Sequence, residues 1–133
     1  FHVKAGLMRS SGRKLIPIYT SRGDAEAFLV YPYIYNRLGD WIGFVTPKRE
    51  VYSVLGYYVG IFSEDFRIIG RRATNTLKPR LKPPPAPGKV FPPATVPLAP
   101  MMRELTHGQV DILLDDPDRL HPLDSGEFRE DMD

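Results

Sequence analysis

The sequence predicts a mainly β fold: a small rosette of β-hairpin repeats, followed by an extended proline-rich arm and a mostly irregular acidic tail with short helical turns. Three observations predict it. One short pattern of tyrosine and glycine occurs three times in the first half of the chain. Most of the 14 prolines then fall between residues 79 and 100. The last segment, 103–133, holds three Lys or Arg against ten Asp or Glu.

The repeated pattern has a fixed spacing. A glycine follows each tyrosine by four residues, a small residue comes four positions later, and a large apolar residue follows directly. The tyrosines are 16 and 17 residues apart, which is about the length of one hairpin and its connection. The three copies are Tyr19/Gly23/Ala27/Phe28, Tyr35/Gly39/Gly43/Phe44 and Tyr52/Gly56/Gly60/Ile61. We therefore expect each copy to form strand, tight turn and strand.

The glycines Gly23, Gly39 and Gly56 are predicted to lie in the hairpin turns with positive φ, because a type I turn followed by a bulge residue needs that conformation. Turn-forming residues such as Asn36 and Ser53 precede them. Partial fourth copies flank the repeat, and their residues are 7–12 and 66–70.

Simple alternation along the second strand of each copy predicts which side chains share a face. It places Ala25, Trp41 and Tyr58 on the same face as the small residues that follow them two positions later. A small residue between two larger ones suggests that the strands approach an axis closely there. We expect the small residues to be buried near that axis, and they are Ala27, Gly43 and Gly60.

The three copies together resemble the four-fold β-flower domain family of bacterial proteins. The resemblance covers residues 7–70, about half of the chain. It implies a small all-β rosette of hairpins. The family brings no established catalytic residues to carry over to this sequence.

The composition divides the chain into a β-hairpin repeat domain at 1–76, a proline-rich arm at 77–100 and an acidic C-terminal tail at 101–133. There are no cysteines, which excludes disulfides and thiolate metal sites. The most apolar stretch, 25–35, is interrupted by Pro32, so no membrane-spanning segment is predicted. The sequence does not indicate a compartment.

The arm is predicted to be extended, because its proline density prevents helix and sheet and favours polyproline II. Its apolar side chains would allow it to dock on its own domain or on a partner, and we expect the arm and tail to bind mainly another chain. The predicted partner-binding residues are Phe91, Val96, Leu98, Met101 and Met102. Pro84, Pro87 and Lys89 also match a weak SH3-ligand pattern.

Charge offers an alternative. Residues 1–102 hold 15 Lys or Arg against six Asp or Glu, and many of these cations lie between Arg67 and Lys89. Such a stretch would attract a nucleic acid or an anionic membrane surface, although a merely solvated surface would look the same. The candidate polyanion-binding residues are Arg71, Arg72, Lys78, Arg80 and Lys82. Trp41, Tyr57 and Tyr58 could stack on bases if they were exposed.

The tail offers short elements. Residues 100–106 are expected to form a short helix that ends near Gly108, and 110–114 is apolar enough to be buried. Asp124, with Glu127 three positions later, is a predicted helix start. The clustered aspartates between 111 and 118 lack the glycine and closing glutamate of an EF-hand, so we predict no metal site.

No catalytic motif is present. The three histidines are far apart in sequence, and neither a nucleophile elbow nor a phosphate loop occurs. We therefore predict no enzyme, no catalytic residues, no cofactor and no small-molecule substrate. The sequence favours a non-enzymatic interaction module, an accessory structural subunit that docks through its arm and tail onto other protein chains of a larger complex, with a membrane complex or surface as a possible setting and nucleic acid disfavoured.

Overall fold

The computed structural model describes residues 14–72 and 78–123, and it confirms the mainly β class. The strands are β1 (Ile16–Tyr19), β2 (Ala25–Val30), β3 (Tyr33–Asn36), β4 (Trp41–Val45), β5 (Glu50–Ser53), β6 (Tyr58–Phe62), β7 (Ile68–Arg71) and β8 (Gln109–Asp111). Two short helical elements follow, α2 (Ile112–Asp115) and the 3-10 helix η1 (Pro117–Arg119).

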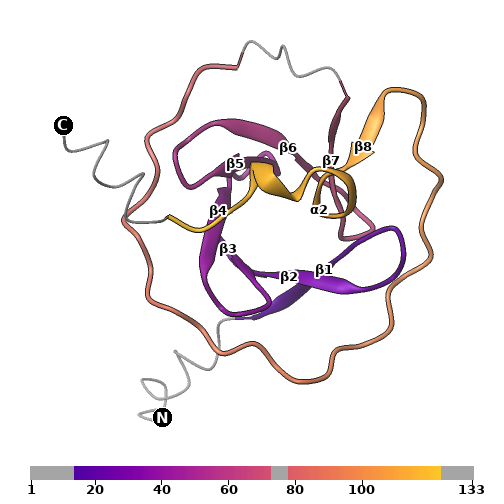
Figure 1. Ribbon diagram of the computed structural model, residues 1–133, viewed down its shortest axis with the longest axis horizontal. Coiled ribbons are helices and arrows are strands. Elements are labelled where there is room, and N and C mark those ends of the chain that lie inside the picture. The colour runs from indigo at the N-terminus through magenta and orange to yellow at the C-terminus, as the bar shows by residue number, and fades with distance from the viewer. Residues whose placement is uncertain (1–13, 73–77, 124–133) are drawn as a thin grey trace.

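All of these strands form one antiparallel sheet in the order of the sequence. The sheet curls into a half-barrel, and residues 78–108 run round its outside before the chain returns as β8 (Figure 1). Each repeat copy is one hairpin, namely β1–β2, β3–β4 or β5–β6. The spacing of the tyrosines therefore measures one hairpin and the connection to the next.

The hairpin turns have the geometry that their residues require. Gly23, Gly39 and Gly56 have φ of 90°, 87° and 92°. The amide of each glycine donates to the carbonyl three residues earlier, at 2.8–3.0 Å. The side-chain oxygen of that earlier residue accepts the amide two positions further along, as Asn36 Oδ1 accepts from Leu38 N at 2.9 Å. We call these the glycine turns.

The predicted alternation of side chains is wrong in one respect. Tyr35 pairs with Trp41 but its neighbour Ile34 pairs with Gly43, so Ile42 is an extra residue in a bulge. The same shift of register occurs in the other two hairpins. Because of this bulge, Trp41 lies on the opposite face from Gly43.

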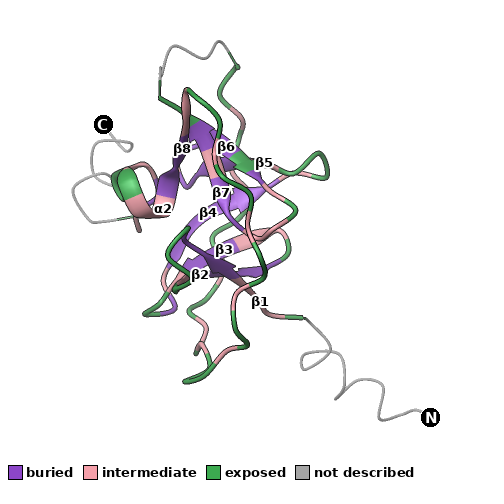
Figure 2. Cartoon of the chain, turned by 90° about the vertical axis from the view of Figure 1, so that its right-hand side faces the viewer, coloured by how far each residue is buried: buried purple, intermediate pink, exposed green. Residues whose placement is uncertain are grey.

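The sheet consequently has two apolar faces. The concave face is mainly aliphatic, and its buried residues include Ile18, Ile34, Val51 and Ile68. The convex face carries a second, mainly aromatic cluster that contains Tyr35, Trp41, Phe44, Tyr52, Val30 and Val54. Figure 2 shows the buried residues concentrated in the strands. A sheet with apolar residues on both faces needs cover on both sides.

The C-terminal segment covers the concave face. β8, from the region assigned to the tail, pairs with β7 and extends the sheet, and α2 lies across the middle of the curl (Figure 1). Ile112 and Leu120 are buried in the aliphatic core. The centre of the rosette is therefore filled by side chains from the tail as well as by the close approach of strands.

The helix predicted at 100–106 is wrong, since residues 101–106 are irregular. The carbonyl of Arg103 instead accepts a hydrogen bond from Arg67 Nη2 at 2.8 Å, and Gly108 has φ of 87° in the turn before β8. The partial repeat at 7–12 and the helix start at Asp124 lie outside the described residues.

The small residues of the repeat are buried. The surroundings of Gly43 show why a larger side chain does not fit there. A Cβ built on Gly43 would lie 2.6 Å from the carbonyl oxygen of Tyr52 and 2.8 Å from Cδ2 of Leu120. We expect Gly43→Leu to lower the free energy of unfolding by about 1–3 kcal/mol through overpacking. Denaturant unfolding would measure this change, and an unaltered midpoint would show that Leu120 and the next strand can move aside at no cost.

Candidate functional site: the arm and its anchors

The described part of the arm, residues 78–100, is held by the glycine turns. The amide of Leu81 donates to the carbonyl of Gly56 at 3.0 Å, and the amide of Val90 donates to the carbonyl of Gly39 at 3.1 Å. The side chains of Leu81 and Val90 pack against the aromatic cluster of the convex face. The arm therefore supplies the cover that this face of the sheet needs.

The glycines are required at these contacts for a second reason besides their positive φ. A Cβ built on Gly39 would lie 1.9 Å from the carbonyl oxygen of Val90, and one on Gly56 would lie 1.9 Å from that of Leu81. A contact of this length is impossible for a real side chain. The arm backbone thus rests directly on the α-carbons of two turn glycines.

The arm meets the turns in reverse order along the sequence. Leu81 contacts the third turn, Val90 the second, and Ala99 lies 3.9 Å from the position that a Cβ of Gly23 would take in the first. These three arm residues are nine positions apart. The arm therefore contacts each of the three repeat copies once, and the nine-residue spacing of these contacts is the signal of this docking that the sequence contains.

Two tyrosine hydroxyls fix the arm between these contacts. Tyr33 Oη donates to the carbonyl of Pro85 at 3.0 Å, and Tyr19 Oη donates to the carbonyl of Pro97 at 2.8 Å. Because proline has no amide hydrogen, its carbonyl is the backbone group that an extended proline-rich segment can offer. The arm is thus held through its backbone at both ends and in the middle.

Several cations of the basic stretch also hold the arm. Lys78 Nζ lies 2.9 Å from Glu50 and above the ring of Tyr58, and its hydrogen bond lowers the pKa of Glu50. Arg80 Nε donates to the carbonyl of Leu55 at 2.6 Å, with its guanidinium above the ring of Tyr57.

Of the five candidate polyanion-binding residues, Lys78 and Arg80 therefore contact their own domain. Arg71, Arg72 and Lys82 are exposed to solvent. Lys89, at the end of the basic stretch, lies 3.5 Å from Asp40. The basic stretch thus splits into cations that attach the arm and cations that face water. Tyr57 is exposed but Trp41 is buried, so the proposed stacking surface is not assembled.

The predicted partner-binding residues separate into two groups. Phe91, Leu98 and Met101 are 89%, 95% and 97% exposed. Val96 and Met102 are half-buried. Phe91 follows the anchored Val90 directly, and its side chain is fully in solvent while that of Val90 packs on the domain. In an extended backbone, successive side chains point in different directions. When one residue packs on the domain, its neighbour therefore points toward solvent.

A polar cluster joins the first hairpin to the last strands, and we call it the closure cluster: Ser21, Asp65, Arg67 and Asp111. Arg67 is 3% exposed and Asp111 is 1% exposed. Asp111 Oδ2 accepts from Ser21 N at 2.6 Å and from Ser21 Oγ at 2.7 Å. Arg67 Nη1 donates to Ser21 Oγ at 2.8 Å. The sheet is held in its curled form at this point.

Arg67 is also paired with Asp65, through Nε at 3.1 Å and Nη2 at 2.6 Å. Burial acts to raise the pKa of Asp65, but hydrogen bonds from Arg67 and Ser63 outweigh it and hold that pKa below its ordinary value of 3.8. Asp65 is therefore a carboxylate at neutral pH and is already paired, which is unsuited to the role of general base.

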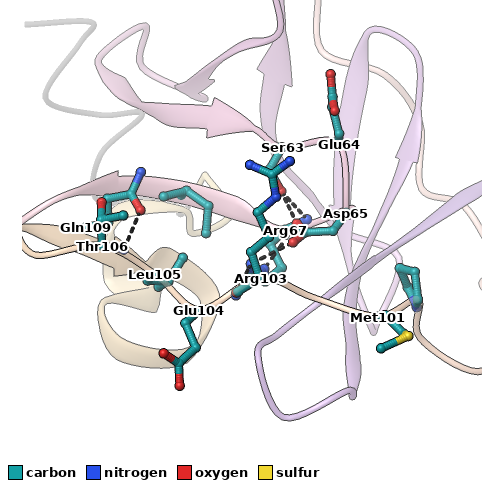
Figure 3. A pocket seen from close by; sticks show the side chains of 12 residues that line it. Ser63, Glu64, Asp65, Arg67, Met101, Arg103, Glu104, Leu105, Thr106 and Gln109 are labelled. Atoms are coloured by element: carbon teal, nitrogen blue, oxygen red, sulfur yellow. Dashed lines mark hydrogen bonds and ion pairs between the residues drawn. The ribbon is translucent and has the colours of Figure 1, made fainter.

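A cavity of about 660 Å³ lies beside this cluster, between the β6–β7 turn and residues 100–106 (Figure 3). Ser63, Arg67 and Met101 line it. Ser63 donates to Asp65, and neither His107 nor His121 lines the cavity, so the described residues bring no nucleophile and base together here. Across 14–72 and 78–123 no group of three metal-ligating side chains is found. No helix in those ranges is long and apolar enough to cross a membrane.

Comparison with known proteins adds no relative. No family model, no curated protein and no solved structure matches the chain. The resemblance to the four-fold β-flower family therefore rests on the three repeat copies themselves.

Proposed function

We propose that this protein is a non-enzymatic interaction module, an accessory subunit that binds another protein chain through the outer side of its arm. The observation that supports this most is the solvent exposure of the side chains of Phe91, Leu98 and Met101. Each is at least 89% exposed, although the backbone is attached to the β domain at Val90, Pro97 and Arg103, on either side of these residues. Aromatic side chains and methionine are enriched at protein interfaces relative to the rest of the protein surface.

The way in which the arm is attached makes binding less costly. A free proline-rich segment would lose conformational freedom when it met a partner, and that loss would reduce the affinity. Here the contacts at Leu81, Val90 and Pro97 already restrict the backbone. The exposed side chains can therefore bind with little further ordering.

The alternative, binding of a nucleic acid or an anionic membrane surface, has less support. Three exposed cations, Arg71, Arg72 and Lys82, remain from the predicted set. Electrostatic binding weakens steeply as salt rises from about 50 to 200 mM, whereas binding through apolar side chains does not. A salt titration of the native assembly therefore distinguishes the two functions.

We expect the triple variant Phe91→Ser, Leu98→Ser and Met101→Ser to leave its assembly while the β domain remains folded. Size-exclusion chromatography of an extract from the native source, with detection of the tagged chain, would show a shift from high mass to the mass of the free chain. The free energy of unfolding should change by less than about 0.5 kcal/mol, because these side chains are in solvent.

Leu38→Ser is the matched control. Leu38 is 72% exposed in the turn next to the arm, but it does not belong to the arm. It should stay in the assembly. If the triple variant also stays there at moderate salt, or if it unfolds, the exposed side of the arm is not the interface.

A further inference from the structure

The three hairpins differ at one equivalent position on the convex face. The first residue of each bulge pairs with the tyrosine of its repeat: Tyr35 with Trp41, Tyr52 with Tyr58, and Tyr19 with Ala25. The second and third copies thus place a large aromatic side chain where the first copy has a methyl group. Equal register means that these three side chains leave the sheet in the same direction.

In the second and third copies, the aromatic ring at this position is tightly held. Trp41 packs edge-on against Tyr33, with ring centroids 6.1 Å apart, and its indole nitrogen donates to the carbonyl of Gly43 at 2.7 Å. Tyr58 packs edge-on against Tyr52 at 5.6 Å. Each ring therefore has an aromatic neighbour and a place on the convex face of the sheet.

In the first copy, the corresponding place is a cavity of about 620 Å³, which we call the Ala25 cavity. Ala25 and Phe28 line it from the sheet, and Pro92, Pro93 and Val96 line it from the arm. Its volume lies within the range of pockets that bind organic groups.

The arm over the Ala25 cavity is fixed on both sides. Val90 is hydrogen-bonded to the second glycine turn, and the carbonyl of Pro97 accepts from Tyr19 Oη. These two contacts hold the arm on either side of the gap above the short side chain of Ala25. The cavity thus follows from two features of the chain. Residue 25 carries no ring, and the arm is attached on either side of it, at Val90 and at Pro97.

The lining of the Ala25 cavity indicates what it can hold. Phe28 is buried, so the apolar part of the lining comes mainly from Ala25, Val96 and the two prolines, which can contact the face of an aromatic ring, and the larger part of the lining is polar. Its edge carries Asp24 together with Glu26 and Arg37, whose charged groups are 3.9 Å apart. The carboxylates can accept a hydrogen bond from an indole N–H or a phenol O–H. An aromatic side chain with a polar edge meets both requirements, and a purely aliphatic one meets only the first.

We propose that the Ala25 cavity receives a tryptophan or tyrosine side chain of the partner protein, in the place that Trp41 and Tyr58 occupy in the other two hairpins. This inference rests on the proposed function, because it names the chemistry of the partner. The cavity lies under the same part of the arm that exposes Phe91 and Leu98. A partner that inserts one ring here would also reach those two side chains.

The test uses the full chain and a small probe, so it does not need the partner. N-acetyl-L-tryptophanamide is titrated while the ¹H–¹⁵N NMR spectrum is recorded, with N-acetyl-L-leucinamide as the aliphatic comparison. We expect the tryptophan probe to shift the amide signals of Ala25, Phe28 and Ala94, and the leucine probe to bind at least about tenfold more weakly. No saturable shift at these amides would overturn the proposal.

The variant Ala25→Trp should fill the cavity from within, and the binding of the tryptophan probe should fall by at least about tenfold. Ala25→Tyr, which copies the third hairpin, serves if the larger ring is not accommodated, and a dispersed NMR spectrum checks that either variant is folded. Ile61→Trp, which adds a ring at an exposed strand position, should leave probe binding unchanged. Equal binding to the Ala25 variants and the unaltered chain would exclude this cavity as the site.

These outcomes separate the inference from the proposed function. If the probe binds and Ala25→Trp blocks it, but the arm variants remain in their assembly, the cavity is a site and the interface lies elsewhere. If the arm variants leave the assembly while Ala25→Trp remains in it, the arm is the interface and no partner ring enters the cavity. The second result would overturn the inference alone.

Discussion

The variant Arg67→Ala is expected to lose about 3–5 kcal/mol of the free energy of unfolding, because it removes one partner of a buried ion pair. Its guanidinium is paired with Asp65 and also donates to Ser21 Oγ and to the carbonyl of Arg103. Its loss would leave the partly buried carboxylate of Asp65 without its cation and would remove the donor to Ser21 and Arg103. The first hairpin, the last strands and the end of the arm segment would then be joined less firmly.

Denaturant unfolding monitored by tryptophan fluorescence would measure the effect of Arg67→Ala, since Trp41 is the single tryptophan and is buried. Arg71→Ala is the matched control. Arg71 lies four residues later in the same basic stretch but is exposed, so its loss should cost less than about 0.5 kcal/mol. Equal effects of the two variants would show that Arg67 is a surface cation, as its place in the sequence suggests.

The ion pair of Arg67 and Asp65 makes the free energy of unfolding depend on pH. Because the pKa of Asp65 is lower in the folded chain than its ordinary value, the pair stabilises the fold fully above the unfolded pKa. That contribution is lost as the pH falls through the folded pKa. The stability difference between the unaltered chain and Arg67→Ala should therefore be constant near neutral pH and shrink below about pH 4.

The parts of the fold that could be predicted from the sequence are those set by local residues. A tight turn needs positive φ at one position, so Gly39 and Gly56 mark their turns directly. The bulge three residues after each turn glycine could not be predicted, because its extra residue has no common character: it is Glu26 in the first hairpin and Ile42 in the second. Its effect depends on pairing with the neighbouring strand, which local alternation does not contain.

The roles of β8, of the arm and of Arg67 could not be predicted from the sequence for a different reason. β8 is only three residues long, and about 40 residues separate it from its partner β7 in the sequence. No short sequence pattern therefore predicts this pairing. The arm binds the turns mainly through backbone amides and carbonyls, which every residue type except proline supplies alike. Arg67 differs from its cationic neighbours only through burial, and that burial arises when the sheet curls and brings Ser21 and Asp111 beside it.

Alanine at the three turn glycines is expected to separate backbone strain from attachment of the arm. All three have φ close to 90°, so each change should cost about 1–2 kcal/mol through the conformation alone. At Gly23 the new Cβ would lie 3.9 Å from Ala99 Cβ, an ordinary contact, so strain is the whole effect there. At Gly39 and Gly56 the methyl group would occupy the position of an arm carbonyl.

We therefore expect Gly39→Ala and Gly56→Ala to lose about 1–3 kcal/mol more than Gly23→Ala, because each also breaks one hydrogen bond and withdraws one apolar side chain from the convex face. Hydrogen exchange gives the decisive readout. In Gly39→Ala the amide of Val90 should lose its protection while that of Leu81 keeps it, and Gly56→Ala should show the reverse. Equal losses of stability at the three glycines, or a Val90 amide that stays protected in Gly39→Ala, would show that the arm does not depend on these turns. If the predicted pattern is found, each turn holds its own section of the arm, and the outward side chains between them depend on the repeat for their position.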